Sequence, residues 1–200
     1  MPHSRVLKSQ PLRLGGGVMK GRRLQAPPGL RVRPTSGRVR QALFNMLRDW
    51  VEGAIFVDLF AGTGSVGLEA LSHGAKRVYF VECDRRAGLA LRTNVERCGA
   101  ADRSTVIAAA LPQALHRLPV GLQADILFLD PPYASDLAEM TLAALQTSPL
   151  LAAHGLMIWQ HAVQRQVPGE VLGRCCWKRR RYGDTQLTVF RPEHTVSRDR

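Results

Sequence analysis

The run Asp130-Pro131-Pro132-Tyr133 has residue types that suit chemistry on a weakly nucleophilic amino group. The exocyclic nitrogen of a nucleic-acid base shares its lone pair with the ring, so an enzyme must place acceptors where its N–H bonds point during reaction. Asp130 and the Pro131 carbonyl can accept such bonds, and consecutive prolines stiffen the turn by fixing φ and removing backbone donors. Tyr133 offers a ring on which a base can stack. Taken alone, the run would be better explained as a Pro-Pro turn after a buried strand, with Tyr133 as packing.

A glycine-rich loop is the second candidate, because Gly62, Gly64 and Gly67 match the GxGxxG spacing shortly after Asp58. Glycines let the backbone approach a ligand closely at the start of a helix. Glu82, at the end of the next apolar run, can bind the ribose hydroxyls of either a dinucleotide or S-adenosylmethionine. Asp58 favours S-adenosylmethionine, since it suits a cationic amino group and would repel a pyrophosphate. The alternative for Asp58 is a carboxylate that caps a helix or turn.

The elements that position these residues alternate between short apolar runs and helical patterns, which predicts a doubly wound α/β fold with a mostly parallel sheet. The expected strands are 54–60, 77–82, 105–109, 125–129 and 155–160, and the expected crossover helices are 65–73, 85–98, 112–117 and 137–151. Ligands of such sheets bind at the carboxyl ends of the strands. Both candidate motifs follow a strand and should meet there.

Further elements are expected on both sides of this core. Residues 175–181 and 185–191 suggest a hairpin of antiparallel edge strands around Tyr182-Gly183-Asp184. Residues 12–18 and 22–26 flank a glycine-rich turn and predict a small N-terminal β-hairpin arm. A helix follows, capped by Thr35 or Ser36. Its apolar stripe, expected in the core, is Val39, Leu43, Met46, Leu47 and Trp50. We expect a basic arm at 1–34, one domain at 35–191, and a disordered basic tail at 192–200.

Positive charge is concentrated at the two ends of the chain. The formal net charge is +12, of which residues 1–50 contribute +10 and residues 174–200 contribute +5, while the middle is slightly acidic. This asymmetry favours nucleic acid as the partner, although solvated basic tails that aid solubility are the alternative. The candidate RNA-binding residues are Arg22, Arg23, Arg38, Lys178, Arg179 and Arg180.

The remaining composition argues for a cytoplasmic protein. The four cysteines lack zinc-ligand spacing and a small secreted scaffold, which fits a reducing compartment, and we assign no metal. We find no signal segment and no apolar run long enough to cross a bilayer. One small domain offers no evident oligomer seam, so we expect a monomer.

The motifs in this order and spacing resemble a class I methyltransferase of the amino-methylating group. Further runs resemble the bacterial RsmD family of 16S ribosomal RNA guanine-N2 methyltransferases, over roughly residues 12–191. They are Arg33-Pro34-Thr35, Arg38-Val39-Arg40, Ala42-Leu43-Phe44-Asn45, Gly67-Leu68-Glu69-Ala70-Leu71, Gly74-Ala75 and Tyr182-Gly183-Asp184-Thr185. The resemblance implies a seven-stranded Rossmann-like sheet, S-adenosylmethionine as cofactor, and ribosomal RNA in the small subunit or its assembly intermediate as partner.

The resemblance also assigns roles to residues. Asp130, Pro131, Pro132 and Tyr133 become catalytic, and Asp58, Phe60, Gly62, Gly64, Glu82 and Cys83 bind cofactor, with Arg33 and Thr35 at its methionine end. Two positions depart from the family pattern. Ala108-Ala109-Ala110 leaves adenine contacts to backbone and apolar groups, and Gln160 stands where relatives commonly have Glu. The alternatives are an adenine-N6 methyltransferase on DNA or RNA, a nicotinamide oxidoreductase, and a non-catalytic RNA-binding assembly factor.

Overall fold

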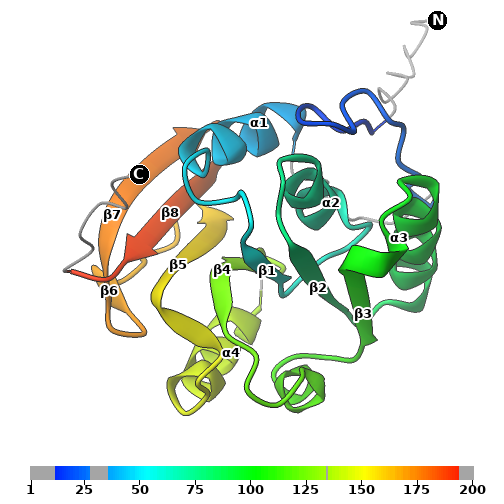
Figure 1. Ribbon diagram of the computed structural model, residues 1–200. Helices are drawn as coiled ribbons and strands as arrows, with labels where there is room; N and C mark the ends of the chain where they lie inside the picture. Colours follow the sequence, from blue (N-terminus) through cyan, green and yellow to red (C-terminus); the bar gives the residue numbers. More distant parts are fainter. Residues whose placement is uncertain (1–11, 28–35, 134, 194–200) are drawn as a thin grey trace, which may run out of the picture.

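The computed structural model describes residues 12–27, 36–133 and 135–193, which fold around one twisted sheet (Figure 1). The sheet has eight strands in the order β3-β2-β1-β4-β5-β8-β7-β6. The strands are β1 (Ile55–Asp58), β2 (Arg77–Glu82), β3 (Ser104–Ala108), β4 (Ala124–Leu129), β5 (Leu151–Ala162), β6 (Glu170–Val171), β7 (Arg174–Tyr182) and β8 (Thr185–Arg191). The doubly wound α/β class expected from the sequence is confirmed.

The sheet is parallel in one part and antiparallel in the other. Strands β3, β2, β1, β4 and β5 run parallel, whereas β8 pairs antiparallel with β5, and β7 pairs antiparallel with β8. The expectation of seven strands was wrong, because β6 adds a two-residue strand too short to leave a periodic pattern. The expectation that 185–191 lies at an edge was also wrong, since β8 lies between β5 and β7.

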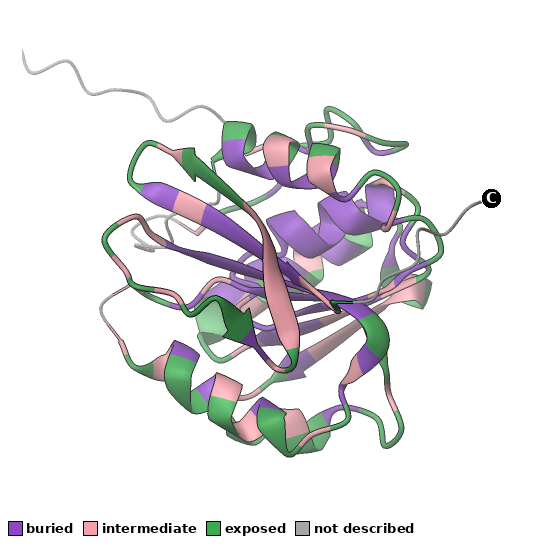
Figure 2. Cartoon of the chain, turned by 90° about the vertical axis from the view of Figure 1, so that its left-hand side faces the viewer, coloured by how far each residue is buried: buried purple, intermediate pink, exposed green. Residues whose placement is uncertain are grey.

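Helices cover both faces of the sheet, as Figure 1 shows. One face packs against α1 (Gly37–Met46), α2 (Ser65–Ser72) and α3 (Arg85–Arg97), and the other against α4 (Leu137–Gln146) and the short 3₁₀ helix η2 (Gln113–Arg117). A further 3₁₀ turn, η1, spans Ala101–Arg103. Two apolar cores result, one on each face of the sheet. All eight residues of α2 are buried (Figure 2).

Local signals explain most helix boundaries. Ser36 caps α1 by accepting from the Val39 N–H at 3.3 Å, as expected, and Asp84 caps α3 by accepting from the Ala87 N–H at 2.8 Å. The helix expected over 137–151 instead ends at Gln146, and the crossover expected over 112–117 is a 3₁₀ helix. Leu151 already belongs to β5, where it pairs with Ala124. Sheet pairing therefore overrides the apolar pattern that extended α4.

The N-terminal arm, residues 12–27, folds back on itself but forms no strand in the described part of the chain. Its two sides meet in a single antiparallel bridge between Arg13 and Arg23. Two backbone hydrogen bonds flank this bridge, from the Leu14 N–H to the Arg22 carbonyl at 3.0 Å and from the Leu24 N–H to the Leu12 carbonyl at 2.8 Å. Donors in the turn between the two sides bond to α2. The N–H groups of Gly15 and Gly16 donate to the Glu69 carboxylate, and the Met19 N–H donates to Ser72 Oγ at 2.8 Å. The arm therefore pairs across one short antiparallel bridge, without the two extended strands of a longer hairpin, and its turn docks on α2.

Glycines permit this close approach of the arm. Gly17 has φ +69°, and a Cβ there would lie 1.9 Å from the Ser72 carbonyl oxygen. A Cβ on Gly16 would lie 2.5 Å from His73 Nε2. Beneath the turn, Glu69 also pairs with Arg40 of α1 at 2.8 Å, and both side chains are at most 2% exposed. This buried ion pair joins the arm, α1 and α2 into one unit.

Candidate active site

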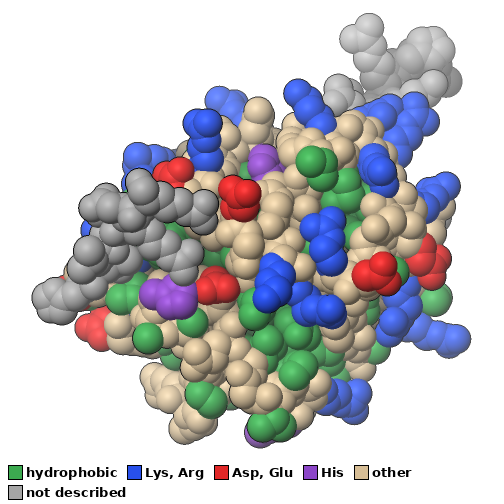
Figure 3. All heavy atoms as spheres, viewed as in Figure 1, with side chains coloured by type: hydrophobic (Ala, Val, Ile, Leu, Met, Phe, Trp, Pro, Cys, Tyr) green, Lys and Arg blue, Asp and Glu red, His purple; other side chains and the backbone are tan. Residues whose placement is uncertain are grey.

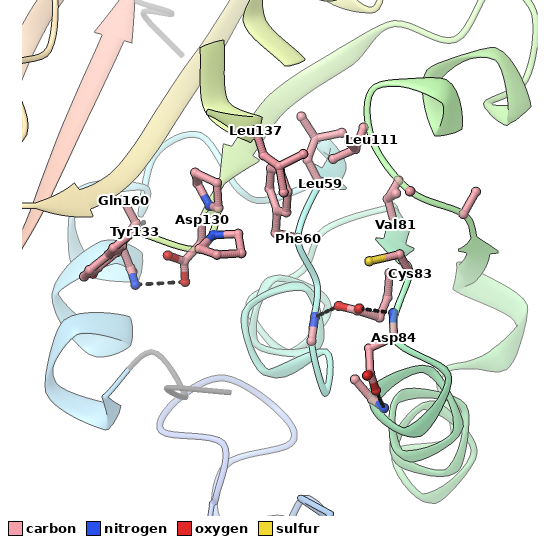
Figure 4. Close-up of a pocket in the computed structure, with 17 residues that line it drawn as sticks. Leu59, Phe60, Val81, Cys83, Asp84, Leu111, Asp130, Tyr133, Leu137 and Gln160 are labelled. Atoms are coloured by element: carbon pink, nitrogen blue, oxygen red, sulfur yellow. Dashed lines mark hydrogen bonds between the residues drawn. The ribbon is translucent and has the colours of Figure 1, made fainter. Parts of the chain in front are cut away.

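A cavity of about 620 Å³ opens at the carboxyl ends of the parallel strands, where the sequence placed the ligand site. Its lining comes from the carboxyl ends of β2 and β5, the segments that follow β1, β2, β3 and β4, and the starts of α3 and α4. The lining residues are Leu59, Phe60, Gly62, Val81, Glu82, Cys83, Asp84, Ala87, Ala109, Ala110, Leu111, Asp130, Pro131, Pro132, Tyr133, Leu137 and Gln160. Figure 4 shows Cys83 and Asp84 on one side, Asp130 with Gln160 on the other, and Phe60 between them.

The glycine loop after β1 is held in its shape by local geometry. Gly62 and Gly64 have φ of +55° and +82°, in the left-handed region that favours glycine. A Cβ on Gly64 would lie 2.2 Å from Leu91 Cδ1, and one on Gly67 would lie 2.3 Å from the Phe80 ring. The loop and the start of α2 can therefore pack against β2 and α3 only with glycine at these positions.

Glu82 ties this loop to the end of β2. One carboxylate oxygen accepts from the Gly62 N–H at 2.7 Å, and the other accepts from the Asp84 N–H at 2.7 Å (Figure 4). Its neighbour Cys83 lines the cavity, and burial together with the charge of Glu82 raises the pKa of the Cys83 thiol. The thiol therefore stays neutral at physiological pH. It serves as a weakly polar wall and is a poor nucleophile.

Asp58 lies beneath the loop, outside the cavity lining. Its side chain is 1% exposed, and Oδ2 accepts from the Gly67 N–H at 3.2 Å while Oδ1 is buried without a hydrogen-bond partner in the described chain. Burial, with a smaller contribution from the negative charge of Asp130, raises the pKa of Asp58 to about 8. A buried carboxyl of this kind holds a proton unless a cation comes near it.

The proline run forms the opposite wall of the cavity. Asp130 follows β4 directly, and its Oδ2 accepts from Gln160 Nε2 at 2.8 Å (Figure 4). The Tyr133 hydroxyl lies 3.1 Å from Thr185 Oγ1 at the start of β8. Side chains from β5 and β8 thus bond the two polar members of the run. The arrangement presents a carboxylate, a stiff turn and an aromatic ring to one space.

The structure brings together most of the predicted site residues. Phe60, Gly62, Glu82, Cys83, Asp130, Pro131, Pro132 and Tyr133 all line the cavity. Asp58 and Gly64 lie behind the lining, because one is covered by the loop and the other faces Leu91. Arg33 and Thr35 lie outside the described residues.

The candidate RNA-binding cations lie outside the cavity, on two sides of the domain. Arg22, Arg23, Arg38, Arg179 and Arg180 are exposed, and Lys178 is half-buried. Arg22 donates to the Arg97 carbonyl of α3, and Arg179 donates to the Val167 carbonyl beside β7. Lys178 Nζ lies 3.9 Å from the centre of the Trp177 ring. The Lys178 ammonium thus lies over an aromatic ring.

Several lining residues were not singled out from the sequence as site residues. Asp84 and Leu137 lie at the starts of α3 and α4, and the capping pattern before α3 could have indicated Asp84. Ala109 and Ala110 form the apolar wall expected after the third strand. Gln160 was noticed only as a departure from the family pattern, because its contact with Asp130 joins residues far apart in the sequence.

The described residues contain neither of two other kinds of site. Across residues 12–27, 36–133 and 135–193, no cluster of three or more His, Cys, Asp or Glu side chains could hold a metal ion. Within the same ranges, no helix has the length and apolar character needed to span a membrane.

Comparison with known proteins gives the family. The family model described as Conserved hypothetical protein 95 matches residues 12–191. The chain is 34% identical over 157 residues to ribosomal RNA small subunit methyltransferase D of Escherichia coli K12, covering 78% of each protein. The solved structure of yhhF from Escherichia coli has a TM-score of 0.79 and 31% identity, covering 92% of this chain and 99% of that one.

A more distant structure supports the fold alone. The precorrin-6y C5,15-methyltransferase of Geobacter metallireducens superposes with a TM-score of 0.62 at 16% identity, covering 84% of this chain and 93% of that one. The methyltransferase fold is therefore shared with both solved structures. The match over residues 12–191 and the close relatives together show that the chain belongs to the RsmD family, described as Conserved hypothetical protein 95.

Proposed function

We propose that this protein transfers a methyl group from S-adenosylmethionine to the exocyclic N2 amino group of a guanine in 16S small-subunit ribosomal RNA. One observation carries the proposal. Asp130 and its proline run face the same cavity as Gly62 and Glu82, so an amino-group acceptor and a nucleoside-binding loop share one space. The name of the Escherichia coli relative supports ribosomal RNA of the small subunit as the substrate class.

The cavity fits the proposed cofactor in its chemistry. The Glu82 carboxylate, at the end of β2, can accept from ribose hydroxyls through lone pairs beyond those used by Gly62 and Asp84. Leu59, Val81 and Leu111 supply apolar surface for an adenine ring. The buried Asp58 carboxyl, whose pKa is raised to about 8, would lose its proton and become negative when a cation binds beside it. When bound, S-adenosylmethionine supplies an activated methyl group on a sulfonium, which is its own leaving group.

The residues of the opposite wall would act on the target base. Asp130 can accept a hydrogen bond from the N2 amino group, which keeps the nitrogen lone pair directed at the methyl donor. The Pro131 carbonyl can serve as a second acceptor, since the prolines contribute no competing N–H groups. The Tyr133 ring can stack on the guanine. The base must leave its own stack to reach this wall, at a cost of about a few kcal/mol.

Cations outside the cavity would hold the RNA backbone. Lys and Arg side chains are spread over the face shown in Figure 3, including the parts formed by the arm, α1 and β7. Phosphate contacts of this kind position a nucleic acid without reading its sequence. We therefore assign Arg22, Arg23, Arg38, Lys178, Arg179 and Arg180 to RNA binding. The proposal places the protein in the cytoplasm as a monomer that acts on the small subunit or its assembly intermediate, without a metal.

The deciding experiment is identification of the methylated nucleoside. Purified protein is incubated with radiolabelled S-adenosylmethionine and small ribosomal subunits that lack the modification, and the RNA is digested to nucleosides. We expect label in N2-methylguanosine. Label in N6-methyladenosine would retain the enzyme class but contradict the base. Cofactor binding without transfer to any RNA would favour the RNA-binding assembly factor, and binding of a nicotinamide dinucleotide instead would favour the oxidoreductase.

A further inference from the structure

Gln160 is a buried amide in the cavity wall whose hydrogen bonding is confined to Asp130. The side chain is 4% exposed, and Nε2 donates to Asp130 Oδ2 at 2.8 Å. A carboxylate can only accept, so the amide nitrogen must be the group that faces it. This chemistry fixes which end of the amide is nitrogen, an assignment that shape alone leaves open. The opposite end, Oε1, is then the carbonyl oxygen.

The carbonyl oxygen of the Gln160 side chain accepts no hydrogen bond from the described residues. Oε1 is buried and has no hydrogen-bond partner among the described residues. Burying an amide carries a desolvation cost that full hydrogen bonding would offset, and here only the nitrogen end is bonded. An apolar side chain of similar shape, such as methionine, would avoid that cost. Stability of the fold therefore does not account for glutamine at this position.

Sheet pairing fixes Gln160 beside Asp130. Strands β4 and β5 run parallel, and Leu129 pairs with Trp159, so the residues that follow them lie next to each other. The backbone after Asp130 is stiffened by Pro131 and Pro132. The orientation of the Asp130 carboxyl then depends on the bonds that its oxygens make. The Gln160 donor holds one of these oxygens, Oδ2, in place.

We propose that Gln160 is a positioning residue that holds the Asp130 carboxylate in the orientation needed to accept from the target amino group. The inference rests on the proposed function, because it assigns Asp130 to that acceptance. An amide has a further advantage as the donor. It donates across the whole working pH range, whereas an acidic side chain at the same place would donate only while protonated.

The first test compares Gln160→Met with the wild-type protein. Misplacing a reacting group by about 1 Å can cost roughly 100-fold in rate. We expect kcat to fall by about that factor. The Kd for S-adenosylmethionine and the KM for RNA should not change, and the melting temperature should be unchanged or slightly higher. Gln186→Met is the matched control, since Gln186 lies on neighbouring β8 outside the cavity lining. Wild-type kcat in a folded Gln160→Met protein would overturn the inference.

The second test uses Gln160→Glu to restore a donor conditionally. Two carboxyl groups at hydrogen-bond distance share one proton, and the shared proton is lost at higher pH. Activity should therefore return toward the wild-type value at low pH and fall on the alkaline side, while Gln160→Met stays slow throughout. Parallel pH profiles for the two variants would mean that donation to Asp130 is irrelevant.

A third measurement needs no turnover. In protein labelled with ¹⁵N-glutamine, the Gln160 side-chain amide signals should shift in Asp130→Ala and the Gln186 signals should not. Unchanged Gln160 signals would contradict the contact itself. Failure of the proposed function shows differently, as absence of transfer by the wild-type protein while this amide still responds to Asp130.

Discussion

The polar side chains on the two sides of the cavity are held by different kinds of hydrogen bonds. On the side of β2, the Glu82 carboxylate accepts from the backbone N–H groups of Gly62 and Asp84. On the side of β4, the bonds join side chains from separate strands, Gln160 to Asp130 and Tyr133 to Thr185. Backbone donors persist when neighbouring side chains change, whereas a bond between side chains is lost with either partner. The half that we propose binds the cofactor therefore depends on one side chain and the backbone (the cofactor half), and the half that we propose binds the base depends on pairs of side chains (the target half).

Replacing the acceptor of the target half should have the largest effect. In Asp130→Ala, kcat should fall by roughly 10³-fold, because loss of one preorganised polar group in an active site costs about 10² to 10³ in rate. The Kd for S-adenosylmethionine should change less than about twofold. Rates from single-turnover methylation and Kd from calorimetry test both. Methylation at the wild-type rate would remove Asp130 from the mechanism, and a large rise in Kd would break the separation of the two halves.

Replacing Glu82 should show the opposite signature. Hydrogen bonds to charged groups are worth about 1.5–3 kcal/mol, so Glu82→Ala should weaken S-adenosylmethionine binding by roughly 10- to 100-fold. At saturating cofactor, kcat should stay near the wild-type value. Glu82→Gln is the control, because its single amide oxygen can accept from Gly62 or Asp84 but cannot bridge both as a carboxylate does. If kcat fell in Glu82→Ala as much as in Asp130→Ala, the two halves would not act separately.

The pH dependence of cofactor binding tests the carboxyl beneath the loop. Below about pH 8 the buried Asp58 carboxyl holds a proton in the unliganded protein. Binding a cation beside it must release that proton, so the Kd should fall about tenfold per pH unit as pH rises toward 8 and then become constant. Asp58→Asn should make the Kd independent of pH. A flat wild-type profile would show that Asp58 is too far from the cofactor's charge to respond.

The same carboxyl predicts a trend in stability. The folded state raises the pKa of Asp58 from 3.8 to about 8, so it binds the proton more tightly than the unfolded chain does. The contribution of Asp58 to folding is therefore greatest at low pH and is lost progressively as pH rises toward 8. Asp58→Asn should raise the melting temperature relative to wild type at pH 8, and the gain should shrink toward pH 5.

The smallest effect is expected from cations outside both halves. Each lost phosphate contact lowers the salt slope of RNA binding by about one unit, so Arg22→Ala with Arg23→Ala should reduce it by about two. Catalysis at saturating RNA should not change. Lys76→Ala, an exposed cation just before β2, is the control. An unchanged slope in the double variant would assign these arginines to solubility.

Local patterns in the sequence predicted the parts of the fold that depend on local properties. The bounds expected for β2 and β8 match the structure, because each strand is an uninterrupted run between turn residues. The proline run and Glu82 meet in one cavity because strand ends share one edge of a parallel sheet. These features follow from periodicity and topology alone.

The features that the sequence did not predict depend on contacts between distant residues. The Gln160–Asp130 bond spans 30 positions, and the bond between Gly15 and Glu69 spans 54. The burial of Asp58 depends on how the glycine loop closes over it, which its own residue type does not indicate. β6 forms because two residues reach the exposed side of β7. Composition and spacing carry no information about such pairings.

The docking of the arm onto α2 has a consequence for protein engineering. The basic arm would be a natural segment to delete when testing RNA binding. Deletion would also remove the Gly15 and Gly16 donors from Glu69 and leave that carboxylate, buried beside Arg40, short of partners. A shortened chain would lose folding free energy together with its cations. The RNA contacts proposed for Arg22 and Arg23 are therefore best removed one side chain at a time, with the glycine turn of the arm left in place.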